Sequence, residues 1–141
     1  MHERKANAEW KGNLKDGRGT VSSGSGALRD VAYEFRSRFE SGTNTNPEEL
    51  IGAALAACYS MALAHDLAEA GHPAESVRTE AKVSFEKQDA GWTITRITLD
   101  VTGRVPGVSA DVFQQAAEKT RTGCPVARSL RADIQVNARL A

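Results

Sequence analysis

Apolar and polar residues alternate with a period of two in several parts of the chain, which is typical of half-buried β-strands. In the first third, the alternating residues 9–11 and 19–22 flank an Asp-Gly pair, so we expect a hairpin there. A third strand is expected over residues 32–40. In that strand Arg36 and Arg38 would share one face, because successive side chains point to opposite sides.

The strongest helix signal in the chain starts at Asn46. Asparagine is a favoured N-cap, Pro47 suits the first helical position, and Glu49 is placed to complete a capping box. The following residues are small and apolar, so the helix is expected to run to about Ala70, where Gly71 ends it.

The second half of the chain shows the same period of two in three further segments. Residues 77–86 and 92–101 predict two strands joined by a turn, and the alternation slips once near Thr95, which indicates a bulge. A helix over residues 110–122 and a last strand over residues 134–140 follow. Strands, helix, strands, helix and strand in this order predict an α+β fold.

Length and composition set simple limits on the class of protein. The chain has 141 residues, 40% hydrophobic and 26% charged, so residues 1–141 are expected to form a single domain. Lys plus Arg equals Asp plus Glu at 18 each, which argues against nucleic-acid binding and against an anionic membrane. The uncharged stretch over residues 50–64 is too short to cross a bilayer, and no secretory signal is recognised, so we expect a cytoplasmic protein.

Two cysteines carry the candidate chemistry, and their settings differ. Cys58 lies inside the apolar helix, where a buried, inert thiol and a reactive one are equally compatible with the sequence. Cys124 precedes Pro125, so it is expected to be the N-cap of a short helical turn, where amide donors would favour a thiolate. Local electrostatics alone therefore favour Cys124 as the nucleophile.

The other candidate sites are weaker. The cysteines and histidines form no closely spaced pair, so we expect no metal site, and nothing in the sequence indicates a cofactor. His65 lies seven residues after Cys58 on the helix, about 10.5 Å away, beyond hydrogen-bond reach.

The motifs Thr45–Leu63 (TNPEELIGAALAACYSMAL) and Thr122–Val126 (TGCPV) resemble the OsmC/Ohr family of thiol peroxidases, closer to its OsmC branch. The resemblance covers nearly the whole chain and implies antiparallel sheets packed around central helices in an intertwined homodimer. It implies that Cys58 attacks the peroxide and that Cys124 resolves the product as a disulfide. It also implies that Arg38, held by Glu48, favours the Cys58 thiolate, with Arg36 as the alternative if the register differs.

The expected substrates are organic hydroperoxides and also hydrogen peroxide, and the expected reductant is an external dithiol, which the family implies to be lipoyl-linked. Glu48 and Cys58 are ten residues apart on one helix, about 15 Å along its axis. One arginine cannot easily span that distance, so we expect a composite site built from both chains of a homodimer. Tyr59, Met61 and Phe39 are candidates for an apolar pocket.

Two other functions are compatible with the sequence. A dimer that binds an apolar organic ligand would not need Cys58 for its main function. A dithiol-disulfide oxidoreductase acting on proteins is less well supported, because the chain has no C-x-x-C motif.

Overall fold

The computed structural model describes residues 1–39 and 44–141. The chain comprises two compact units, residues 1–50 and residues 51–141, and each is described by itself. The single domain over residues 1–141 stays a prediction.

The first unit is built on a three-stranded antiparallel sheet in the order β1-β2-β3. The strands are β1 (Ala6–Lys11), β2 (Arg18–Ser23) and β3 (Val31–Tyr33). The rings of Trp10 and Tyr33 lie 5.5 Å apart on this sheet. Gly19 permits that contact, because a Cβ atom there would lie 2.5 Å from the Tyr33 ring. The expected hairpin is confirmed, with residues 12–17 as its loop.

The strand expected over residues 32–40 is wrong beyond Tyr33. The chain instead forms a 3₁₀ helix, η1 (Phe35–Arg38), and Glu40 lies outside the described residues. The physical reason is the Ser37 side chain, whose hydroxyl bonds to the carbonyls of Glu34 and Thr45 and offers the backbone an alternative to a sheet ladder. Arg36 and Arg38 therefore do not share a strand face.

Helix α1 (Pro47–Glu69) begins where the capping signals place it. The Glu49 amide donates to Asn46 Oδ1 at 2.8 Å, while the Glu49 side chain accepts from the Thr45 hydroxyl instead of closing a full capping box. Gly71, with φ of +86°, follows the end of the helix, as expected.

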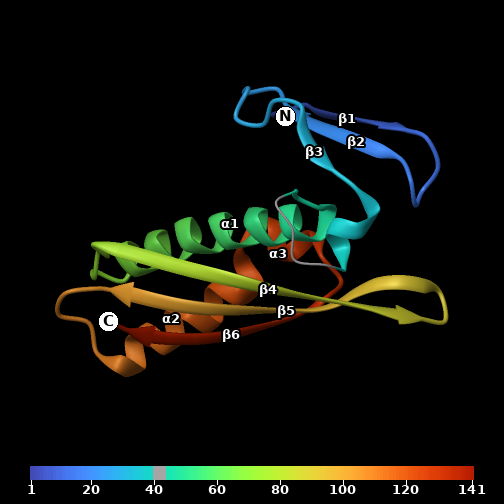
Figure 1. Cartoon of the computed structure of the whole chain (residues 1–141). Helices are drawn as coiled ribbons and strands as arrows, with labels where there is room; N and C mark the ends of the chain where they lie inside the picture. The colour runs from blue at the N-terminus through green and yellow to red at the C-terminus, as the bar shows by residue number, and fades with distance from the viewer. Residues whose placement is uncertain (40–43) are drawn as a thin grey trace. The chain divides into compact units, whose positions relative to one another are not determined.

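The second unit contains a three-stranded sheet in the order β4-β5-β6 with helices alongside it (Figure 1). Its elements are β4 (Ser76–Gln88), β5 (Gly91–Arg104), α2 (Ala110–Gly123), α3 (Pro125–Ser129) and β6 (Asp133–Leu140). The predicted bulge is confirmed, because Ser84 pairs with Arg96 and Phe85 pairs with Ile94, which leaves Thr95 as the extra residue.

The sheet of the second unit is mixed, which corrects the expectation of antiparallel sheets. Strands β4 and β5 are antiparallel, but β6 runs parallel to β5. Helices α2 and α3 lie between β5 and β6 in the chain and provide the crossover that a parallel pair requires.

The core of the second unit lies between its sheet and its helices. The fully buried side chains include Leu55, Tyr59, Leu63 and Leu67 of α1, Ile97, Leu99 and Val101 of β5, and Phe113 of α2. By length and composition alone α1 would be able to cross a membrane, a test that core helices also pass. The buried residues on one face of α1 belong to the same core cluster as those of β5 and α2.

Candidate active site

The second unit brings the two cysteines together. Cys58 lies on α1 and is partly exposed, whereas Cys124 lies at the junction of α2 and α3 and is only 1% exposed. Both are free thiols, and they lie close enough for Cys58 to raise the pKa of the Cys124 thiol. The two cysteines are 66 positions apart in the sequence. Only the family resemblance predicted that they would lie close together.

Cys124 is held on both sides by backbone groups. Its amide donates to the Thr120 carbonyl at the end of α2, at 3.2 Å. Its Sγ accepts the Ala127 amide at 3.3 Å, so it is the N-cap of α3, as the sequence predicts. A thiol fixed in this way has little freedom to leave the position from which it contacts Cys58.

The pKa of Cys124 is raised, whereas its helix-cap position alone had suggested a lowered pKa. Burial raises the pKa of the Cys124 thiol, the Ala127 amide lowers it by less, and Cys58 raises it further. Desolvation of the packed site outweighs the helix-cap effect from which the sequence argument started.

Two polar contacts join α1, which carries Cys58, to α2, which ends directly before Cys124. The Tyr59 hydroxyl donates to the Ala117 carbonyl at 2.8 Å, and the Thr120 hydroxyl lies 2.7 Å from Asp66 Oδ2. Tyr59 is thus a core residue and not part of an apolar pocket, while Met61 and Phe39 are exposed by 73% and 47%. The sequence offered no signal for the Thr120–Asp66 contact.

Tyr59→Phe is expected to lower the free energy of unfolding by about 1 kcal/mol at neutral pH, the usual contribution of one hydrogen bond. Burial raises the pKa of Tyr59 above its ordinary value of 10.0. The Tyr59 hydroxyl therefore stays protonated to higher pH in the folded chain than in the unfolded chain. The stabilisation is therefore complete below about pH 10 and decreases as the pH rises further. Urea unfolding of the native protein and of Tyr59→Phe across this pH range measures the difference in their free energies of unfolding. This difference should become smaller at high pH, and a difference that does not change with pH would contradict the prediction.

The first unit brings together the other two predicted residues. Arg38, in η1, places its Nε 3.3 Å from Oε2 of Glu48, which lies in the first turn of α1. The Glu48 side chain is only 13% exposed, and the Arg38 side chain is 31% exposed. Glu48 Oε2 is buried and makes no hydrogen bond of good geometry with the described residues, so its contact with Arg38 is an ion pair by distance. Arg38, and not Arg36, is therefore the arginine that meets Glu48.

An apolar recess of about 160 Å³ opens beside Arg38 within the first unit. It is lined by Trp10, Leu14, Tyr33, Glu34, Phe35, Arg38 and Pro47. Sequence reasoning missed it, because its aromatic residues come from two strands and η1. The recess offers an apolar surface next to a guanidinium group.

Within residues 1–39 and 44–141, no group of three or more His, Cys, Asp or Glu side chains is placed to hold a metal ion. The structure thus gives two pairs of groups, the thiols of Cys58 and Cys124 in one unit and Arg38 with Glu48 in the other.

Comparisons with known proteins identify the family of the chain. A model of the OsmC-like protein family matches residues 40–139. The chain is 48% identical to Peroxiredoxin OsmC of Escherichia coli (strain K12) over 137 residues, 97% of this chain and 96% of that protein. It is 29% identical to the organic hydroperoxide resistance protein OhrB of Bacillus subtilis (strain 168), over 86% of this chain and 88% of that protein.

Solved structures share the fold. The crystal structure of OhrB from Bacillus subtilis has a TM-score of 0.71 at 25% identity, over 97% of this chain and 98% of that chain. An OsmC-like protein of unknown function from Vibrio cholerae has a TM-score of 0.79 at 18% identity, over 99% and 100%, and shows the fold alone.

The α+β fold, the paired thiols and the identity with Peroxiredoxin OsmC define a thiol-dependent peroxidase. The chain belongs to the OsmC-like family.

Proposed function

We propose that this chain reduces organic hydroperoxides, and hydrogen peroxide more slowly, with Cys58 as the nucleophile and Cys124 as the resolving residue. The observation that carries the assignment is the pairing of a partly exposed Cys58 with a buried Cys124, whose pKa is raised by burial and by Cys58. The partly exposed thiol of the pair is the one that a peroxide can reach, while the buried thiol lies beside it.

In the first step the Cys58 thiolate attacks the terminal peroxide oxygen and the O–O bond breaks. Cys58 becomes a sulfenic acid, and the alkoxide leaves and takes a proton to form the alcohol. The Cys124 sulfur then attacks the sulfenic sulfur, and its proton leaves with the hydroxyl as water. An external dithiol, which we propose to be lipoyl-linked, reduces the disulfide by exchange and restores both thiols.

Arg38 and Glu48 act on the first step. The guanidinium binds the peroxide oxygens and stabilises charge on the departing oxygen, and Glu48 holds it in place. We propose that the two residue pairs combine into one site in a homodimer. The exposed small residues Ala53, Ala54 and Ala57 on α1 suit close packing of a second copy. The proposed location is the cytoplasm.

The recess beside Arg38 supports an organic substrate. An aryl or alkyl tail would bury apolar area against Trp10, Tyr33 and Phe35, at about 25 cal/mol for each Å² removed from water. Hydrogen peroxide has no such tail.

We therefore expect cumene hydroperoxide to oxidise the protein at least about tenfold faster than hydrogen peroxide does, a difference of 1.4 kcal/mol in the barrier. Stopped-flow measurement of both second-order rate constants, followed by turnover with dihydrolipoamide, tests it. Leu14→Gln makes an exposed wall of the recess polar. It should reduce the ratio of the rate constant for cumene hydroperoxide to that for hydrogen peroxide without affecting the fold. A protein that reacts with neither peroxide would instead favour the binding of an apolar ligand.

A further inference from the structure

Asn46 uses both ends of its side-chain amide. Oδ1 accepts the Glu49 amide at 2.8 Å and so caps α1, and Nδ2 donates to the Ser37 carbonyl at 2.8 Å. The two partners fix the orientation of the amide, because a backbone N–H needs an acceptor and a carbonyl needs a donor. Helix capping requires only the oxygen. The second hydrogen bond is therefore a separate feature, which a different N-cap residue would not provide.

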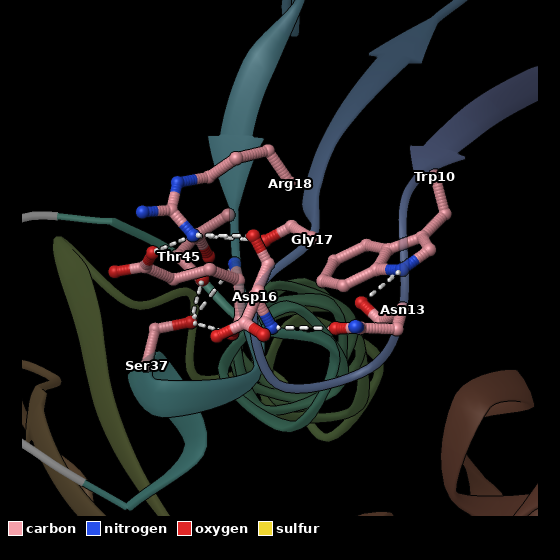
Figure 2. A network of polar contacts seen from close by, with 8 residues as sticks. Trp10, Asn13, Asp16, Gly17, Arg18, Ser37 and Thr45 are labelled. Atoms are coloured by element: carbon pink, nitrogen blue, oxygen red, sulfur yellow. Dashed lines mark hydrogen bonds and ion pairs between the residues drawn. The ribbon is translucent and has the colours of Figure 1, made fainter.

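Ser37 holds the same two segments together from the other side. Its side chain is buried, and its hydroxyl lies 2.8 Å from the Thr45 carbonyl and also meets the Glu34 carbonyl. Figure 2 shows Ser37 and Thr45 directed toward one another in this polar network. Ser37 and Asn46 thus join η1 to the start of α1 through two hydrogen bonds across eight and nine positions of sequence. We call these two residues the clamp.

The clamp acts on the peptide group next to Arg38. The carbonyl that Asn46 binds belongs to Ser37, and it is in the same planar unit as the Arg38 amide. On the other side, Glu48 lies two residues after Asn46, in the helical turn that Asn46 caps. One side chain therefore sets both the backbone that carries Arg38 and the backbone that carries Glu48.

The ion pair does not fix this geometry by itself. The Arg38 side chain is 31% exposed and has many rotamers, and an ion pair with one partner in contact with water adds little to stability. The Arg38–Glu48 contact needs support from the backbone on which the two residues lie.

We propose that Asn46 and Ser37 are positioning residues that place Arg38 for the first step of the peroxidase reaction. The proposal rests on the proposed function. Asn46 does not touch the substrate; it acts through Arg38.

The test compares Asn46→Ser with the native protein. Serine is about as good an N-cap as asparagine, but it cannot also donate to the Ser37 carbonyl. We expect the second-order rate constant for oxidation of Cys58 to fall about tenfold, while the following disulfide formation, which does not involve Arg38, keeps its rate. Glu49→Gln alters a neighbouring contact at the same helix end and should leave both rates within about twofold. Equal losses in both steps would point to general damage and overturn the proposal.

A double-mutant cycle tests whether Asn46 acts through Arg38. In an Arg38→Met background, Asn46→Ser should cost nothing further, because the group it positions is absent. A second tenfold loss in that background would overturn the proposal.

A readout without peroxide separates this proposal from the proposed function. The chemical shift of the Arg38 Nε–H signal in nitrogen-15 NMR reports its contact with Glu48, so it should change in Asn46→Ser and stay unchanged in the control Glu49→Gln. If the native protein reduces neither peroxide, the proposed function fails, while this readout still tests whether the clamp places Arg38. If Asn46→Ser leaves the Arg38 signal unchanged, the clamp is wrong even in an active peroxidase.

Discussion

Cys58→Ser is expected to abolish peroxide reduction, with turnover falling by about 10³-fold or more, the scale of losing a nucleophile. A serine hydroxyl is not ionised near neutral pH, and the thiolate is the form that attacks. The measurement is consumption of cumene hydroperoxide with dihydrolipoamide in excess. The protein should stay folded, because Cys58 is only partly buried and serine is close to it in size.

Cys124→Ser is the matched variant, since it changes the partner of the same thiol pair. It should react with one equivalent of peroxide at a rate near the native one, because the attacking thiol of Cys58 is unchanged. The sulfenic acid should then persist, be trapped by dimedone at Cys58, and give no disulfide in mass spectrometry. Turnover in Cys58→Ser together with its absence in Cys124→Ser would make Cys124 the nucleophile and reverse the assignment.

Local signals in the sequence were sufficient for several elements. The start of α1 follows from Asn46 and Pro47, and the cap of α3 follows from Cys124 before a proline, because such signals act within one helical turn. The bulge at Thr95 was visible because a slip in the period of two moves every later side chain to the other face.

The errors in prediction come from contacts between distant residues. The alternation over residues 32–40 suggested a strand, but Ser37 and Asn46 bond across the intervening segment and give η1 instead. The parallel pairing of β6 depends on the crossover through α2 and α3, which alternation within one strand does not report.

In the candidate site, too, some features could be predicted from the sequence and others depend on contacts between distant residues. The identity of its four residues came from a family resemblance, and the structure places them as two contacting pairs. The electrostatics of Cys124 could not be predicted locally, because its burial depends on packing between α1, α2 and the sheet. The choice between Arg36 and Arg38 also needed the structure, since in a strand both would have pointed the same way.

Arg38→Met is expected to lower the second-order rate constant for oxidation of Cys58 by cumene hydroperoxide about 10²-fold. That is the usual loss when one preorganised donor to a developing oxyanion is removed. Methionine keeps much of the length of the side chain and its contact with the recess, so the missing property is the guanidinium. Stopped-flow detection of Cys58 oxidation measures this step without the reductant.

Arg36→Met is the matched control, because it removes the same charge two residues away in η1, from an exposed position. Its rate should stay within about twofold of the native rate, since an exposed charge acts weakly through screened water. Glu48→Gln should give an intermediate loss, about tenfold, because the amide keeps the size of the side chain but no longer attracts the guanidinium. Equal losses at Arg36 and Arg38 would show that only net positive charge matters, and Arg38 would then have no directional role in the reaction.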